Sequence, residues 1–342
     1  MIRSGTAQPR ELAERLLAGD RRALARAISL LEDDGQAARD LLALLYPHGG
    51  QAQIIGVTGA PGTGKSTLVS GLARAYRERG LTVGILAIDP SSPFTGGALL
   101  GDRLRMRDLS GDPGIFIRSM ATRGATGGLA RVAAEAVHAL DAAGYARIFL
   151  ETVGAGQDEV DVARLAHTVV VVEAPGLGDD IQAIKAGILE TANILVVNKA
   201  DRDGAEQALA ALRLMLELAY PAPAAISHHG TQMEMPAMAA SMPTGWRPAL
   251  LATVATEGRG LPAVIETIEA HRAHLAASGE IGHLEARRAE AQLSQALDEA
   301  LRRLLAEKTD QATYRRTLEE IVSRRLDPHT AAERLVARLR KQ

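Results

Sequence analysis

Residues 59–66 read Gly59-Ala60-Pro61-Gly62-Thr63-Gly64-Lys65-Ser66. This stretch fits G-x-x-x-x-G-K-[ST], the phosphate-binding P-loop. An apolar, β-branched run from Ile54 to Val57 precedes it, and residues 66–79 carry apolar side chains at helical spacing. A strand, a glycine-rich loop and a helix in this order aim backbone N–H groups and a helix N-terminus at phosphate oxygens. The alternative is a glycine-rich turn that fits by chance, and the two flanking elements argue against it.

Apolar runs alternate with amphipathic segments along the middle of the chain. Such alternation is typical of a mainly parallel sheet with helices on both faces. The sequence therefore predicts an α/β fold, a P-loop NTPase G domain with helical N-terminal and C-terminal extensions. The predicted strands cover residues 53–58, 82–88, 114–118, 146–151, 168–173, 193–198 and 249–254.

Three parts of the chain are expected. Residues 1–50 form a helical extension, with breaks at Gly19-Asp20 and Asp34-Gly35, and residues 51–278 form the nucleotide-binding domain. Residues 219–247, rich in Pro, Ala and Met, are an irregular insertion. Residues 279–342 form a helical arm that buries little by itself, so we expect it to pack on the G domain, a second copy or a partner. Its predicted helices cover residues 283–307, 311–325 and 329–340, after a helix at 261–278.

Composition limits the classes of function. The 342 residues are 46% apolar and 23% charged, as in globular proteins. A net charge of −2 argues against nucleic-acid or membrane-surface binding. The absence of cysteine removes disulfides, Fe–S clusters and thiolate zinc sites, and residues 1–10 lack the apolar core of a signal peptide, so we expect a cytoplasmic protein. The pairs His228-His229 and His271/His274 are expected at the surface, not as metal ligands.

A P-loop needs carboxylates on the Mg²⁺ side, at the ends of neighbouring strands. Lys65 would reach the β- and γ-phosphates and the Ser66 hydroxyl would bind Mg²⁺. The candidate carboxylates are Asp89, Asp102 and Glu151. Each could instead be an ordinary strand-end carboxylate that caps a helix.

Two segments resemble nucleotide switches. Residues 151–154, Glu-Thr-Val-Gly, have the form of the D-x-x-G switch with Glu in place of Asp, and the Gly154 N–H could contact a γ-phosphate. Gln157 is a candidate for positioning water, although a residue at a helix start explains it equally well. Residues 175–182 form a glycine-rich, charged loop between two core strands that could move on nucleotide exchange, or be a plain connection.

Asn198-Lys199-Ala200-Asp201 follows a buried strand and matches N-K-x-D, the guanine-reading motif. Asp201 can accept from guanine N1–H and the 2-amino group, a pair of donors that adenine does not offer. Asn198 and Lys199 would support the loop and stack on the base. Thr253, Val254 and Ala255, after the last strand, could complete the pocket. Four residues alone are a weak signal, but after a P-loop they favour guanine strongly.

Together these stretches resemble the MeaB-type GTPases, the G-protein chaperones of methylmalonyl-CoA mutase. The resemblance lies in GAPGTGKST at 59–67, DPSSPFTGGALLGDRLRM at 89–106, ETVGAGQDE at 151–159, APGLGDDIQAIKAGILE at 174–190 and VNKAD at 197–201. These segments look like the P-loop, switch I, switch II, switch III and base loop. The likeness covers about residues 10–285 and weakens in 219–247 and in the C-terminal arm.

The resemblance implies a homodimer held partly by the arm, with GTP/GDP and Mg²⁺ bound. It implies slow GTP hydrolysis that is stimulated by an adenosylcobalamin-dependent acyl-CoA mutase, whose cofactor loading the hydrolysis gates; an adenosyltransferase is a further partner to consider. Lys65, Glu151 and Gln157 would act in catalysis, and Ser66, Asp89, Asp102 and Glu151 on the Mg²⁺ side. In switch III, about Gly176 to Lys185, the residues to mutate are Asp179, Gln182 and Lys185. The expected nucleotide contacts are Gly59, Ala60, Pro61, Gly62, Thr63, Gly64, Lys65, Ser66, Thr67, Gly154, Asn198, Lys199, Asp201, Thr253, Val254 and Ala255.

Other functions compete with a mutase chaperone. A nickel-type metal-insertion GTPase usually carries Cys and His ligands near its nucleotide, and this chain has no cysteine. A transport-related kinase or ATPase would prefer adenine, against Asn198 to Asp201. A scaffold that only binds nucleotide would not need the Mg²⁺-side carboxylates. Which acyl-CoA mutase is served stays open.

Overall fold

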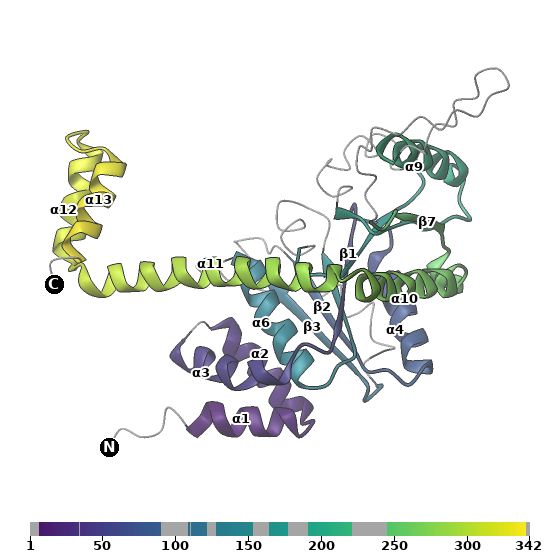
Figure 1. The fold of residues 1–342 in the computed structure, drawn as a ribbon, viewed down its shortest axis with the longest axis horizontal. Coiled ribbons are helices and arrows are strands. Elements are labelled where there is room, and N and C mark those ends of the chain that lie inside the picture. The colour runs from purple at the N-terminus through teal and green to yellow at the C-terminus, as the bar shows by residue number, and fades with distance from the viewer. Residues whose placement is uncertain are drawn as a thin grey trace. The chain divides into compact units, whose positions relative to one another are not determined.

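The chain forms two compact units, residues 1–284 and residues 285–342. The structure, a computed structural model, describes residues 7–33, 35–89, 109, 111–121, 128–152, 164–176, 191–220 and 245–339. Figure 1 shows the strands of the first unit gathered in one sheet, with helices around them.

Seven strands make up this sheet, in the order β3-β2-β4-β1-β5-β6-β7. All neighbouring pairs are parallel, so every strand ends at the same edge. The predicted fold class is therefore confirmed, and each strand lies where the sequence predicts it, within a few residues at its ends. The strands are β1 (Gln53–Thr58), β2 (Val83–Asp89), β3 (Ile115–Ala121), β4 (Arg147–Thr152), β5 (Thr168–Glu173), β6 (Ile194–Val197) and β7 (Ala249–Ala252).

Alternate residues of each central strand enter opposite hydrophobic cores, because successive side chains of a strand point to opposite faces. In β1, Ile55 and Val57 pack in a core with the helices α4 (Lys65–Glu78) and α10 (Leu261–Ser278). Ile54 packs in the other core, with α6 (Gly128–Ala142), α9 (Ala205–Ala219) and the N-terminal helices. The middle residues of the central strands are therefore apolar on both faces, as in parallel strands covered by helices on both sides.

The N-terminal extension consists of α1 (Ala7–Leu17), α2 (Arg21–Glu32) and α3 (Gln36–Leu45), followed by a 3₁₀ turn, η1 (Tyr46–His48). The predicted break at Gly19-Asp20 is confirmed, since the Asp20 side chain caps α2 by accepting from the backbone N–H groups of Arg22 and Ala23. Polar contacts also join this extension to β3, where Arg118 binds Glu32 at 2.7 Å. The extension is thus part of the first unit.

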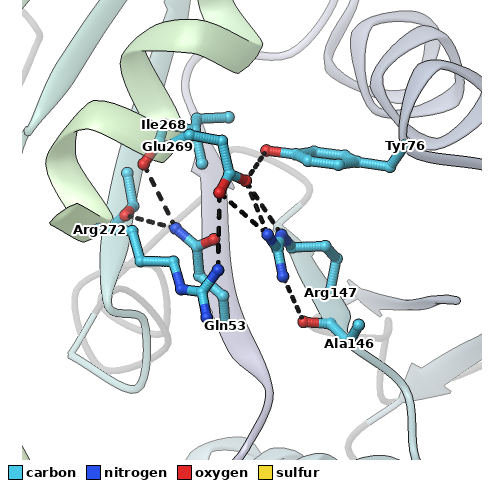
Figure 2. A network of polar contacts seen from close by, with 8 residues as sticks. Gln53, Tyr76, Ala146, Arg147, Ile268, Glu269 and Arg272 are labelled. Carbon is cyan, nitrogen blue, oxygen red and sulfur yellow. Dashed lines mark hydrogen bonds and ion pairs between the residues drawn. The ribbon is translucent and has the colours of Figure 1, made fainter. Parts of the chain in front are cut away.

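A network of polar side chains closes the edge of the sheet at which the strands begin (Figure 2). Arg147, the first residue of β4, binds the Glu269 carboxylate of α10 through two nitrogens, at 2.9 Å and 3.1 Å. Tyr76, near the end of α4, donates its hydroxyl to Glu269 at 3.0 Å. Gln53, the first residue of β1, donates to the Ile268 carbonyl at 3.4 Å. Burial and then the Glu269 carboxylate raise the pKa of Tyr76. This network attaches α10 to the base of the sheet.

The expectation that His271 lies at the surface is wrong. Only 2% of His271 is exposed, and its Nδ1 lies 2.9 Å from the Thr168 hydroxyl at the start of β5. The ring of Trp246 lies against it, with centroids 4.8 Å apart, and also against His274 at 5.6 Å. Burial lowers the pKa of His271 to about 4, with smaller contributions from His274 and His167. The helix α10 therefore turns His271 into the core, whereas the side chain of His274 stays 26% exposed.

The second unit contains most of α11 (Glu280–Lys308), together with α12 (Gln311–Val322) and α13 (Pro328–Leu339). Large apolar side chains stay exposed along α11, between 41% and 62% for Leu293, Leu297, Leu301 and Leu304. The helices predicted in this part of the chain are confirmed. The domain boundaries at 50/51 and 278/279 stay predictions. Among the residues that the structure describes, no helix has both the length and the apolar character to span a membrane.

Candidate functional site

The P-loop connects β1 to α4 at the edge where all strands end. At two of its glycines, Gly59 and Gly64, a side chain would collide with a neighbouring residue. Gly59 has φ 138°, and a Cβ there would overlap the Val172 carbonyl oxygen of β5. Gly64 has φ 94°, and a Cβ there would overlap the Asn198 side-chain nitrogen. The loop can therefore pass close to both neighbours only because these residues are glycines.

Lys65 is the first residue of α4 and is buried, 6% exposed. Its ammonium donates to the carbonyl oxygens of Gly59 at 2.8 Å and Ala60 at 3.0 Å, both in the loop itself. These acceptors are neutral. A phosphate oxygen in the loop would offer the ammonium a charge-assisted hydrogen bond, which is the stronger kind. The position of Lys65 thus suits an anion bound at the N-terminus of α4.

Ser66 lies opposite Glu151, the fifth residue of β4. The Ser66 hydroxyl donates to a Glu151 carboxylate oxygen at 2.5 Å, and both residues are buried. A hydroxyl and a carboxylate are hard oxygen ligands, which Mg²⁺ prefers. The chemistry of this pair therefore fits a magnesium ion beside the P-loop, and of the candidate carboxylates Glu151 is the one whose side chain the structure places there.

The remaining carboxylate and switch candidates are described incompletely or not at all. Asp89 ends β2, and its backbone pairs with Ala121 of β3, but its side chain lies outside the described part. Also outside the described residues lie Asp102, Gly154, Gln157, Asp179, Gln182 and Lys185, and residues 221–244 of the insertion.

Asn198 joins the P-loop to the predicted base pocket. Its side-chain nitrogen donates to the Thr63 carbonyl at 2.8 Å. Its side-chain oxygen accepts from the Thr253 hydroxyl and from the Ala255 N–H, each at 3.1 Å. Asn198 is 2% exposed, so a polar side chain is buried here with its hydrogen bonds made. These contacts are made by the side chain for which the sequence predicts a role in supporting the base loop, and that role stays a prediction.

The rest of the base loop is open to solvent. Lys199 reaches back over the P-loop, and its ammonium donates to the Gly62 carbonyl at 2.6 Å. Its backbone has φ 58°, a left-handed conformation that is uncommon for a residue other than glycine. Asp201 is exposed, whereas Thr253, Val254 and Ala255 are buried beside Asn198. An exposed carboxylate next to a braced loop can meet a base that arrives from solvent.

Sequence reasoning missed one polar pair at this edge. The Thr152 hydroxyl donates to the Thr58 hydroxyl at 3.0 Å, and both side chains are buried, 4% and 2% exposed. These threonines are the last residues of β4 and β1. Their pairing could be seen from the sequence only once the register of the two strands was known.

The arrangement as a whole is a phosphate-binding loop with a metal-side pair on one flank and a base loop on the other. Family comparison agrees with this geometry. Residues 24–310 match the family described as "Methylmalonyl Co-A mutase-associated GTPase MeaB".

Individual relatives extend over nearly the whole chain. A protein of Pyrococcus abyssi is 45% identical over 330 residues, which are 95% of each chain. GTPase ArgK of Escherichia coli is 33% identical, again over 95% of each chain. Among solved structures, the "LAO/AO transport system kinase" is similar with a TM-score of 0.66, 29% sequence identity and coverage of 98% of each chain.

Proposed function

The chain belongs to the MeaB family of GTPases, and we propose that its GTP hydrolysis serves an adenosylcobalamin-dependent acyl-CoA mutase as a chaperone. The family match over residues 24–310 carries this proposal, because the family is described by its association with methylmalonyl-CoA mutase. Methylmalonyl-CoA mutase is accordingly the first partner to test. Hydrolysis would gate cofactor loading and protect or reactivate the mutase.

For the chemical step we propose in-line attack of water on the γ-phosphate of GTP. Most of the catalysis in such reactions is positioning and neutralisation of charge. Lys65 would exchange its two carbonyl acceptors for phosphate oxygens, and the N–H groups at the start of α4 would face the same phosphates. Magnesium, when bound, would supply positive charge that offsets the charge of the phosphates. We assign Ser66 and Glu151 to the magnesium side of the nucleotide, with Asp89 and Asp102 as further candidates. Gln157 stays the candidate for positioning the attacking water.

Guanine selection is assigned to Asp201, in a pocket braced by Asn198. The brace supports the assignment because it ties the base loop to the loop that holds the phosphates, at Thr63. A nucleotide whose base binds the base loop and whose phosphates bind the P-loop would therefore be held in a single position. Thr253 and Ala255 stabilise the same amide, so the pocket depends on β7 as well.

We also propose a homodimer held partly by the second unit. Leu293, Leu297 and Leu301 recur every four residues on α11, with Leu304 three residues later, so they share one helix face. Each is at least 41% exposed in the single chain. A second copy that covers this face would remove it from water. Asp179, Gln182 and Lys185 remain the residues proposed to relay contact with the mutase.

Reactivation of purified mutase tests the proposal. Inactivated methylmalonyl-CoA mutase is incubated with the protein, adenosylcobalamin and GTP, GDP or a non-hydrolysable GTP analogue. We expect activity to return only with GTP, and not with Lys65→Ala. The same assay with isobutyryl-, ethylmalonyl- and 2-hydroxyisobutyryl-CoA mutases identifies the partner. Reactivation by Lys65→Ala equal to wild type would contradict the proposal.

A transport-related kinase is the second candidate, because the similar solved structure carries that name. Competition separates the two. Labelled GTP bound to the protein is challenged with ATP and with unlabelled GTP. A GTPase of this family should release label to GTP at least 100-fold more readily, since Asp201 has no matching pair of donors on adenine. Equal competition by ATP would favour the kinase.

A further inference from the structure

The side chains of the last two residues of β4 contact the two elements that flank the P-loop, Glu151 the helix α4 and Thr152 the strand β1. Val57 pairs with Glu151 in the parallel register of β1 and β4, and one step further Thr58 lies opposite Thr152. Successive residues of a strand point to opposite faces of the sheet. Glu151 reaches Ser66 of α4 on one face, and Thr152 reaches Thr58 of β1 on the other.

Ligand binding should affect the Ser66–Glu151 and Thr152–Thr58 hydrogen bonds differently. On the proposed assignment Ser66 and Glu151 would help to hold Mg²⁺, and the direct hydrogen bond between them would then be given up. The Thr152–Thr58 bond joins strand residues on the opposite face, before the first glycine of the loop. Ligand binding does not require this bond to change.

Because both threonines are buried, loss of the Thr152–Thr58 hydrogen bond is costly. Both hydroxyls are almost fully removed from solvent, and a buried hydroxyl without its hydrogen bond is costly. The bond therefore opposes any slip of the end of β4 along β1. Glu151 is the residue directly before Thr152, so the same bond limits where the Glu151 carboxylate can lie relative to Ser66.

We propose that Thr152 is a positioning residue for magnesium binding: through Thr58 it holds the end of β4, and with it Glu151, in register with the P-loop while the Ser66–Glu151 contact is exchanged. This inference rests on the proposed function, in which Ser66 and Glu151 lie on the Mg²⁺ side. The competing explanation is that the two hydroxyls only satisfy each other and stabilise the fold.

Magnesium titration of nucleotide binding separates these explanations. The affinity for a fluorescent GTP analogue is measured in the full-length protein at rising Mg²⁺ concentration, and without Mg²⁺. We call the Mg²⁺ concentration that gives half of the full change in affinity the Mg²⁺ half-effect. For Thr152→Val we expect the Mg²⁺ half-effect to rise five- to tenfold. The affinity in the absence of Mg²⁺ should change less than twofold. Thr152→Ser keeps the hydroxyl and should return the half-effect to within twofold of wild type.

Thr168→Val is the matched control. Its hydroxyl is equally buried and also hydrogen-bonded, but it lies at the start of β5, where it contacts His271. It should lower thermal stability and leave the Mg²⁺ half-effect unchanged. If Thr152→Val likewise lowers stability with an unchanged half-effect, the positioning role is wrong.

Failure of the proposed function would give a different result. Ser66→Ala and Glu151→Gln should each raise the Mg²⁺ half-effect at least tenfold. If neither does, the metal-side assignment itself is wrong and the inference falls with it. If both do and Thr152→Val does not, only the inference is overturned.

Discussion

The two edges of one sheet use buried polar side chains in different ways. At the edge where the strands begin, Arg147, Glu269 and Tyr76 bind one another, side chain to side chain. At the edge where the strands end, Lys65 is held by backbone carbonyls of its own loop. The first set forms a closed network with fixed partners. The second has partners that a phosphate can replace.

The two kinds of contact contribute differently to stability and to function. A closed network contributes to the free energy of unfolding, and removing one partner leaves the other buried without compensation. A residue such as Lys65, whose hydrogen-bond acceptors a ligand can replace, contributes little to the free energy of unfolding before the ligand binds. Changes at one edge should therefore alter the stability of the protein, and changes at the other edge should alter GTP hydrolysis.

The largest effect is expected from Lys65→Ala. Loss of the ammonium removes charge stabilisation of the transferring phosphoryl group, so GTP hydrolysis should fall by at least about 100-fold. The free energy of unfolding without nucleotide should change by less than about 1 kcal/mol, because the hydrogen bonds to the Gly59 and Ala60 carbonyls have neutral acceptors. Phosphate release and urea unfolding measure the two quantities. Lys308→Ala, at an exposed lysine, is the control. A large loss of stability would show that Lys65 is structural as well.

Glu269→Gln should have the next largest effect, at the opposite edge. Arg147 is 6% exposed in its side chain and would keep its charge without the carboxylate. We expect the free energy of unfolding to fall by about 3 kcal/mol, at the low end for a broken buried pair because Glu269 is 29% exposed. The rate of GTP hydrolysis should stay within about twofold, since no residue of the P-loop is touched. Glu266→Gln, at an exposed carboxylate of the same helix, should change neither quantity. A tenfold fall in the hydrolysis rate of folded Glu269→Gln would show that the two edges do not act independently.

The smallest effect is the pH dependence that His271 gives to stability. Its folded pKa of about 4 lies below the unfolded value of 6.5, so the unfolded chain takes up the proton first as pH falls. Stability is therefore lost as pH falls from about 6.5 towards 4, and between pH 7 and pH 5 this group should remove about 2 kcal/mol. Urea unfolding of His271→Gln at both pH values should show a loss smaller by that amount. His48→Gln, at an exposed histidine, controls for the loss of a histidine as such. Equal losses in wild type and His271→Gln would refute the assignment.

Local signals allowed much of the fold and part of the site to be predicted. The P-loop and the base loop each lie within a few consecutive residues, and apolar runs predict the strands around them. The contacts of Arg147 with Glu269, and of Thr58 with Thr152, join residues about 90 to 120 positions apart. No local pattern encodes such pairs, because they arise from strand register and helix packing. The burial of His271 has the same cause: periodicity predicts a helix, but not which of its polar residues turns inward.

The fluorescence of Trp246 reports on the edge of the sheet where the strands begin. Trp246 is the only tryptophan of the 342 residues, and it lies at this edge, against His271 and His274, with its ring N–H bonded to the Asn193 carbonyl at 2.9 Å. Its emission therefore comes from a single, known place, far along the strands from the P-loop. Emission that stays constant when GTP binds will mean that this edge stays rigid. A shift in wavelength or intensity will mean that binding at one edge of the sheet has reached the other.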